Sequence, residues 1–137
     1  NRCLAVVALA ELRDGHRKTP VAPVPGDLRD VIERLGMPVV AAIHGTALGG
    51  GLEVALGSHY RLAMPLGQIG FPEVWQGLLP PADGTQRLPR LIMSERAAEM
   101  LALGDPVPSA HALELGLTDR LAEEGHLVED APVIRMT

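Results

Sequence analysis

The chain is poor in cysteine and in aromatic residues. Cys3 is its only cysteine, and its 137 residues include one tryptophan, one tyrosine and one phenylalanine. A single cysteine excludes an internal disulfide and any metal site built from several cysteines. It also fits a reducing compartment, so we predict a cytoplasmic location. Lysine is equally scarce, because Lys18 is the only one and the remaining basic residues are arginine.

Long hydrophobic runs are also missing. No apolar run reaches the ~20 residues that a membrane-spanning helix needs, so we predict no membrane span. The formal net charge of -5 argues against a general nucleic-acid binder. A local basic patch can still hold an anionic ligand. With 47% hydrophobic and 21% charged residues, the chain is expected to form a globular core, and its length allows at most one domain.

The most informative stretch runs from Pro38 to Ala63. It begins with Pro38–Ile43, a continuous apolar run typical of a strand that is buried on both faces. A turn at His44–Thr46 follows. Apolar residues then recur at helical spacing, which predicts a helix that starts at or just after Gly49–Gly51. The stretch is therefore predicted to be strand, turn and helix.

The three glycines stand where the predicted helix begins. Glycine has a backbone entropy cost, so three in a row indicate close approach of another group to the backbone. Free N–H groups at a helix start suit an oxygen that carries negative charge, and Glu53 follows within the first turn. Backbone donors beside a carboxylate can stabilise an oxyanion and move a proton. The alternative is that the glycines only permit tight packing and that Glu53 is a solvated acid.

A second carboxylate, Glu73, follows Pro72 at the end of a predicted strand. The chain continues GLLPPADGTQRLPR over residues 77–90. Together, HGTALGGGLEVALGSHYRLA, FPEV and GTQRLPRL closely resemble the crotonase, or enoyl-CoA hydratase/isomerase, family. The resemblance runs from about Ala8 to about Leu121. Within the family the chain looks most like the hydratase half of bifunctional enoyl-CoA hydratase/3-hydroxyacyl-CoA dehydrogenases.

The resemblance implies an α/β fold, a crotonase-like spiral of ββα units. It implies addition of water to a 2-trans-enoyl-CoA in fatty acid β-oxidation, with Glu53 and Glu73 as the catalytic acids. The N–H groups of Ala10 and Gly50 become the oxyanion donors, with Gly51 in the same substrate-binding turn. The acyl-CoA thioester is the substrate, and no metal or redox cofactor is implied. A homo-oligomer, or a fused or associated 3-hydroxyacyl-CoA dehydrogenase, is the expected partner.

The sequence leaves two rival functions open. One is Δ3,Δ2-enoyl-CoA isomerase chemistry on the same site, where a single glutamate can shuttle the proton. The other is a truncated, non-catalytic paralogue that serves as a binding or assembly module. Two departures from the family's motifs support the second, because Pro81 and Asp83 replace glycines in a predicted turn. Separately, Leu9 replaces a glycine beside Ala10 and bears on the backbone path there. We expect Gly substitution at 81 and 83 to raise activity.

The resemblance also bears on the extent of the domain. We assign residues 1–123 to a partial crotonase-like domain and residues 124–137 to a tail of unknown structure. Because the match lacks segments that family members have before Ala8 and after Leu121, we expect an incomplete domain. By itself it should be marginal, oligomeric or aggregation-prone, with little or no hydratase activity.

The remaining segments are expected to be scaffold. We predict a helix after Asp27 that Gly36 closes, and two short strands joined by the Met64–Gly67 turn. A further helix starts at Thr85 and is interrupted or ended by Pro89. The last two predicted helices are Glu95–Leu103 and Ala110–Leu115, with Ser94 and Ser109 as N-caps and Gly104 and Gly116 as closing residues. We interpret His44 as structural rather than as a base, assign His59 no role, and expect Trp75 to be a packing or pocket-wall residue.

Overall fold

The computed structural model describes residues 5–10, 30–32, 34–80 and 82–127. Residues 30–32 and 34 are helical, which agrees with the predicted helix there, whereas Asp27 lies outside the described residues. The other elements, in chain order, are β1 (Ala5–Ala10), β2 (Val39–His44), β3 (Ala47–Leu48), α2 (Gly50–Gly57), β4 (Tyr60–Ala63), β5 (Gln68–Gly70), the 3-10 helix η1 (Pro72–Gln76), α3 (Ala82–Leu91), α4 (Ser94–Leu103), β6 (Val107–Pro108), α5 (Ser109–Leu115) and β7 (Arg120–Leu121).

Four strands form the main sheet, in the order β1-β2-β4-β7, and every pair in it is parallel. The central strand β2 has neighbours on both sides, and Val39–Ile43 are 0% exposed. A continuous apolar run is what a strand buried on both faces requires. The predicted strand at Pro38–Ile43 is therefore confirmed, with bounds shifted by one residue.

A second, smaller sheet contains β3, β5 and β6. The chain passes twice from the main sheet to the small one, from β2 to β3 and from β4 to β5, and then continues into helical structure. The strands predicted on either side of the Met64–Gly67 turn both exist, but they lie in different sheets. This crossing brings backbones close together, because a Cβ on Gly67 would lie 1.9 Å from the Gly45 carbonyl oxygen.

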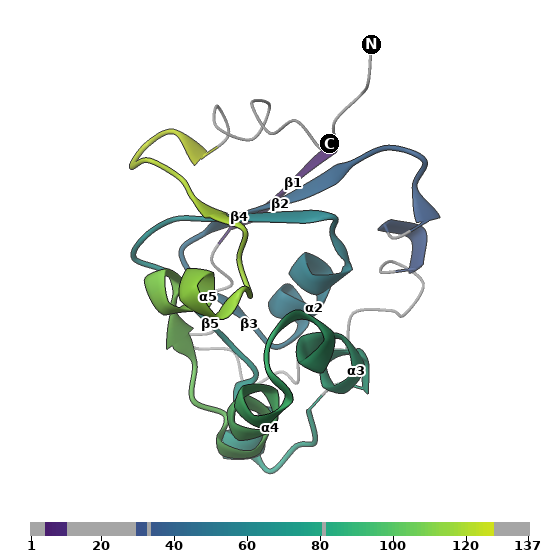
Figure 1. Ribbon diagram of the computed structural model, residues 1–137, viewed down its shortest axis with the longest axis vertical. Helices are drawn as coiled ribbons and strands as arrows, with labels where there is room; N and C mark the ends of the chain where they lie inside the picture. The colour runs from purple at the N-terminus through teal and green to yellow at the C-terminus, as the bar shows by residue number, and fades with distance from the viewer. Residues whose placement is uncertain (1–4, 11–29, 33, 81, 128–137) are drawn as a thin grey trace.

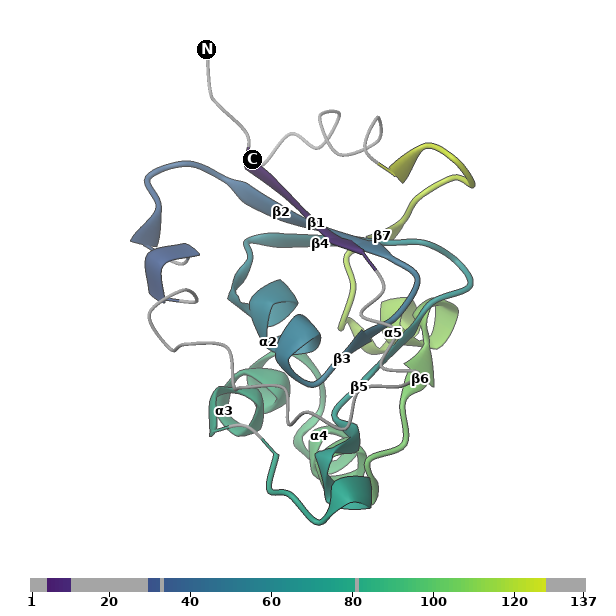
Figure 2. The same cartoon turned by 180° about the vertical axis from the view of Figure 1, so that it is seen from behind.

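The core lies on both faces of the main sheet. The larger cluster includes Ala41, Ile43 and Ala63 on one face and the apolar sides of the helices. The other face carries Val40, Ala42 and Leu62, packed with Ala122 and Leu127. Figures 1 and 2 show α2, α3, α4 and α5 together on one side of the main sheet. Alternate residues of β2 therefore enter different clusters, as strand geometry dictates.

The helix ends differ from the prediction in detail. Gly104 and Gly116 follow α4 and α5 with φ of 73° and 87°, so both predicted glycine ends are confirmed. The predicted serine caps are wrong by one residue, because Ser94 and Ser109 are the first helical residues and make no capping bond. Pro89 does not end α3, since the helix runs to Leu91 and the Ile92 N–H donates to the Leu88 carbonyl at 3.1 Å.

Among the described residues, no helix combines the length and the apolar character needed to cross a bilayer. The predicted turn at Pro81–Asp83 is corrected in part: Ala82 and Asp83 belong to the first turn of α3, while Pro81 lies outside the described residues.

Candidate active site

The N-terminus of α2 is built from the three consecutive glycines. Gly49 precedes the helix with φ of 55°, a left-handed conformation that favours glycine, and no side chain caps the helix there. The first bond within the helix joins the Glu53 N–H to the Gly49 carbonyl at 3.0 Å. The N–H groups of Gly50, Gly51 and Leu52 come before it and have no acceptor within the helix. The predicted helix start is confirmed, and it supplies backbone donors.

Glu73 lies against this helix start although it is 24 residues from Gly49 in the chain. A Cβ built on Gly49 would lie 2.6 Å from the Glu73 Oε1 atom. No real Cβ contact is that short, so only glycine at position 49 leaves room for this carboxylate. The expectation that the glycines admit close approach is thus met by a side chain of the protein itself.

The second oxygen of Glu73 is unusual. The Oε2 atom is buried and has no hydrogen-bond partner among the described residues. Burial raises the pKa of Glu73 above its ordinary value, and a hydrogen bond to its own backbone opposes that shift more weakly. A buried oxygen without a partner is costly and rare in proteins. A carboxyl of this kind, with a perturbed pKa, is a candidate for proton transfer.

Glu53 is the other predicted acid, and it sits in the first turn of α2. It is 2% exposed, so the alternative of a solvated first-turn carboxylate is wrong. The residue also makes an interaction within the protein. A helix N-terminus favours negative charge, which reduces the cost of burying the carboxylate there. Both predicted acids are therefore associated with the same end of α2: Glu53 by its position and Glu73 by contact with Gly49.

Ala10 is the last residue of β1 and pairs in register with His44, the last residue of β2. Leu9 pairs with Ile43 in the same uninterrupted ladder, so the leucine that replaces the family's glycine is accommodated in regular parallel strand. Beyond His44 the chain continues through β3 to α2. Ala10 is thus at the carboxyl end of the main sheet, where parallel α/β sheets commonly place their ligands.

Contacts at two glycines, which the sequence reasoning missed, fix the segment around Glu73. Phe71, which is 0% exposed, precedes η1, and a Cβ on Gly84 of α3 would lie 2.7 Å from its ring. At the end of α4, a Cβ on Gly104 would lie 2.6 Å from Val74 Cγ2. Glycine therefore lets both helices pack closely around η1. The sequence shows Gly104 only as a helix end, and nothing in it indicates the contact.

One histidine of the central stretch, His59, makes structural hydrogen bonds. The His59 Nδ1 atom accepts a hydrogen bond from the Val39 N–H at 3.1 Å, and the His59 N–H donates to the Val39 carbonyl at 2.9 Å. His59 therefore ties the segment after α2 to the start of β2, a role that the sequence did not reveal. His44 is exposed at the end of β2. The described residues contain no cluster of three or more histidine, cysteine or acidic groups able to hold a metal.

Comparison with known proteins gives a consistent result. The family model described as enoyl-CoA hydratase/isomerase matches residues 11–135. Over 108 residues the chain is 48% identical to the peroxisomal bifunctional enzyme of Cavia porcellus and 42% identical to a probable enoyl-CoA hydratase of Bacillus subtilis. These matches cover 79% and 78% of the chain, but only 14% and 42% of the two relatives.

Solved structures agree. The enoyl-CoA hydratase of Bacillus anthracis matches with a TM-score of 0.74 and 39% identity, over 77% of this chain and 41% of that one. The enoyl-CoA hydratase of Mycobacterium tuberculosis matches with a TM-score of 0.68 and 39% identity, over 71% and 38%. The fold is therefore the α/β crotonase fold, and the chain spans less than half the length of these structures. On all of these grounds, the chain belongs to the enoyl-CoA hydratase/isomerase family.

Proposed function

We propose that this chain carries the central part of an enoyl-CoA hydratase site, in which water adds to the double bond of a 2-trans-enoyl-CoA. The observation that supports this most strongly is the Glu73 carboxyl, held against the start of α2 with one buried oxygen that has no partner among the described residues. A bound water or substrate group can satisfy such an oxygen.

The two carboxyls divide the proton transfers. As the water oxygen forms its bond to C3, the Glu53 carboxylate takes the water proton, and the Glu73 carboxyl delivers its proton to C2. We assign the donated proton to Glu73 because burial raises its pKa and so favours its protonated form. After the reaction Glu53 is protonated and Glu73 is ionised. Transfer of the proton from Glu53 to Glu73 through the next water restores the starting state.

The negative charge that develops on the thioester oxygen is assigned to backbone donors. We propose the N–H groups of Gly50 and Ala10, with Gly51 in the same turn, because the helix start supplies N–H groups that no helix carbonyl uses. Water supplies everything that is added to the double bond, so the proposed reaction consumes no metal or redox cofactor. CoA enters as part of the substrate.

Product analysis tests this function. The chain is incubated separately with crotonyl-CoA and with a 3-enoyl-CoA, and the products are separated and identified by mass. Because the chain alone is expected to have little hydratase activity, we expect 3-hydroxyacyl-CoA, heavier than the substrate by one water, to form only slowly from crotonyl-CoA. A shifted double bond without added mass identifies an isomerase. No product with either substrate, despite thioester binding, identifies a non-catalytic binding module, and either result contradicts the proposal.

We also propose a partner for this chain. The chain matches only 14% of the length of the relatives named bifunctional enzymes. Because such a relative carries a second activity, we propose a fused or associated 3-hydroxyacyl-CoA dehydrogenase as the partner. Such a partner would oxidise the 3-hydroxyacyl-CoA that the proposed reaction produces. Some relatives are named as peroxisomal enzymes, so the cytoplasmic location stays a prediction.

A further inference from the structure

The segment that carries Glu73 has few bonds of its own. η1 is a 3-10 helix of five residues, closed by the Gly77 N–H to the Val74 carbonyl at 3.1 Å and by the Leu78 N–H to the Glu73 carbonyl at 3.0 Å. A turn this short is not stable by itself. The position of the Glu73 carboxyl therefore depends on what holds η1 from outside. Phe71 holds one end, beneath α3.

Trp75 holds the other end. Its indole Nε1–H donates to the carbonyl of Leu103 at 2.8 Å. Leu103 is the last residue of α4, where carbonyls lack a partner within the helix. Gly104 follows with φ of 73°, and a Cβ there would lie 3.1 Å from the indole nitrogen. The indole thus meets an available carbonyl at a place that only glycine leaves open.

The exposure of Trp75 separates this role from ordinary packing. The residue is 61% exposed, so burial of the ring explains little of its presence. What the indole provides that an apolar side chain cannot is a hydrogen-bond donor. We propose that Trp75 is a positioning residue, which ties η1 to the end of α4 and thereby holds the Glu73 carboxyl against Gly49. Its catalytic consequence rests on the proposed function, but its structural consequence does not.

The charges around Glu73 allow a direct readout. Charged side chains come from each element packed around η1 and the helix start; they are Glu53 of α2, Arg87 and Arg90 of α3, and Glu95, Arg96 and Glu99 of α4. Burial is the larger cause of the pKa shift of Glu73, and a hydrogen bond to its own backbone opposes it. The pKa of Glu73 therefore reports how far water is kept from its carboxyl, and it should fall when η1 loosens.

The test is a carboxyl titration by NMR on the 137-residue chain with ¹³C-labelled glutamate and no substrate. Trp75→Phe keeps a ring and removes the donor, and Gly104→Ala disturbs the same contact from the side of α4. We expect both to lower the pKa of Glu73 toward its ordinary value. Met93→Ala is the matched control, because Met93 is 70% exposed at the opposite end of α4 and should change nothing. An unchanged pKa in both variants overturns the proposal.

A second measurement needs no variant. Trp75 is the only tryptophan, so the parent chain has one indole N–H signal. As the pH is changed, we expect the chemical shift of this signal to change with the same midpoint as that of the Glu73 carboxyl. An indole signal whose chemical shift does not change over that pH range overturns the proposal. For turnover, Trp75→Phe should lower kcat by up to ~10²-fold with KM unchanged, since small misplacement of a reacting group has costs of that order. If the chain proves not to be a hydratase, the titration results remain interpretable.

Discussion

The Glu73 carboxyl has two unusual features, one at each of its oxygens. One of its oxygens fills the space that a side chain on Gly49 would need, and the other is buried without a partner among the described residues. Neither feature helps folding, because an unpaired buried oxygen loses its hydration without compensation. Groups that cost stability in this way are concentrated at functional sites.

The raised pKa of Glu73 makes a prediction about stability and pH. In the folded chain the carboxyl holds its proton to higher pH than in the unfolded chain, so the free energy of unfolding falls as pH rises through the folded-state pKa. Glu73→Gln removes this dependence. We expect the variant to be more stable than the parent at neutral pH. The difference should disappear at acidic pH, where the Glu73 carboxyl is protonated in both the folded and the unfolded chain.

Urea unfolding of both proteins at several pH values measures the difference. Because Glu73 is partly exposed, the gain at neutral pH is expected to be small. The same substitution at the surface acid Glu95 serves as a control and should show no gain. The stability difference between the variant and the parent should therefore favour the variant more at neutral pH than at acidic pH. The opposite trend contradicts the assigned burial of the Glu73 carboxyl.

At the scale of elements, the sequence predicted what depends on local pattern. The strand at Pro38–Ile43 and the helix after Gly49 follow from a continuous apolar run, a turn and helical spacing. The small sheet was beyond such reasoning, because β3 and β6 have two residues each and exist through contacts between distant segments. Pro89 shows that a local rule can also mislead, since it was predicted to interrupt or end a helix but lies inside α3, which continues to Leu91.

The site was predictable in the same uneven way. Glu53 and the glycines are neighbours in sequence, so their proximity follows from the helix start. The contact between Glu73 and Gly49 joins η1 to α2 across the fold, and only the family resemblance had linked those residues. Nothing in the sequence indicates that Gly84, Gly104 and Leu103 hold η1, because their role is to leave space or to offer a backbone carbonyl.

The start of α2 gives a prediction with an internal control. Gly49→Ala places a Cβ where Glu73 Oε1 lies and imposes a sparsely populated backbone conformation on alanine, which costs about 1–3 kcal/mol before any clash. Gly51 is also at the helix start, yet a Cβ on it has no described atom within 4 Å. Gly51→Ala should therefore be neutral or stabilising by about 0.5–1 kcal/mol.

Thermal or urea unfolding measures both substitutions. We expect Gly49→Ala to be clearly less stable than the parent and to shift the Glu73 carboxyl signal in NMR spectra, while Gly51→Ala leaves that signal in place. Equal effects of the two substitutions would show that Glu73 is not held against Gly49.

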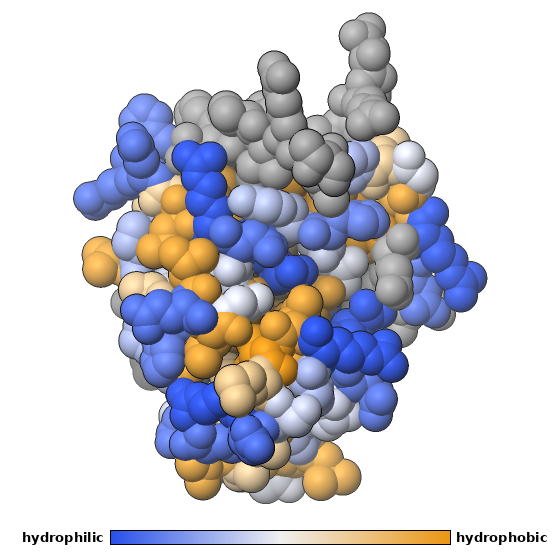
Figure 3. All heavy atoms as spheres, viewed as in Figure 1, coloured by the Kyte–Doolittle hydropathy of each residue, from blue (hydrophilic) through white to orange (hydrophobic). Residues whose placement is uncertain are grey.

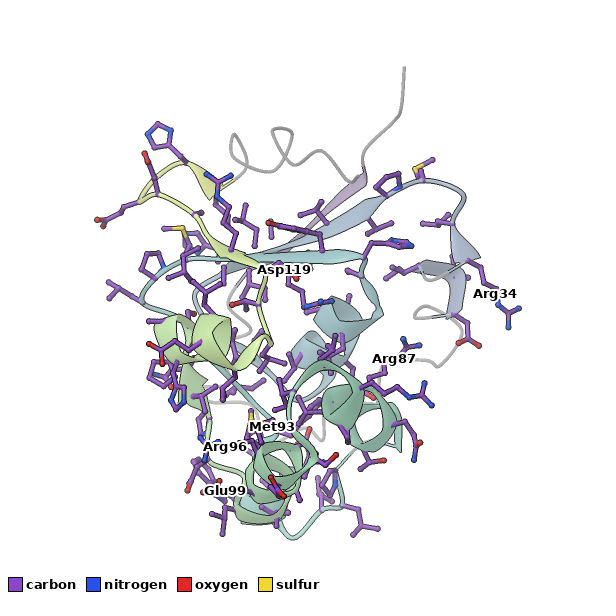
Figure 4. The ribbon with its side chains drawn as sticks, viewed as in Figure 1. Arg34, Arg87, Met93, Arg96, Glu99 and Asp119 are labelled. Carbon is purple, nitrogen blue, oxygen red and sulfur yellow. The ribbon has the colours of Figure 1, made fainter. Side chains whose placement is uncertain are left out.

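At the scale of the whole molecule, one buried cation ties several elements together. Arg61 of β4 donates from Nη1 to the Ser58 carbonyl after α2 at 2.9 Å, and from Nε to the Leu117 carbonyl at 3.0 Å. Its Nη2 atom is 3.2 Å from Asp119 Oδ2, just before β7. Figure 4 shows Asp119 on the segment that approaches the main sheet. Burial lowers the pKa of Arg61, and Asp119 opposes that shift.

Removal of Asp119 leaves this cation with less compensation. Breaking a fully buried pair costs about 3–5 kcal/mol. The Asp119 side chain is 33% exposed, so we expect Asp119→Ala to lower the free energy of unfolding by about 2 kcal/mol. The pair Arg96–Glu99 on α4, also labelled in Figure 4, is the control. Glu99→Ala should cost less than about 0.5 kcal/mol. A similar cost for both, measured by urea unfolding, contradicts the assignment.

The outer surface of the molecule shows how its apolar residues are distributed. Figure 3 shows apolar surface at the centre of the face that bears α3 and α4, bordered by hydrophilic side chains. Exposed apolar residues on these two helices and between them include Met93 and Leu103.

The central claim is that Glu53 and Glu73 together add water to an enoyl thioester. The most direct test is hydration of crotonyl-CoA in H₂¹⁸O by the parent chain, Glu53→Gln and Glu73→Gln, with ¹⁸O in the product measured by mass spectrometry, which detects slow turnover as well as fast. We predict one ¹⁸O atom in the 3-hydroxyacyl product of the parent and a rate lower by ~10²–10⁴-fold in each variant. Hydration at the parent rate in both variants would contradict the account.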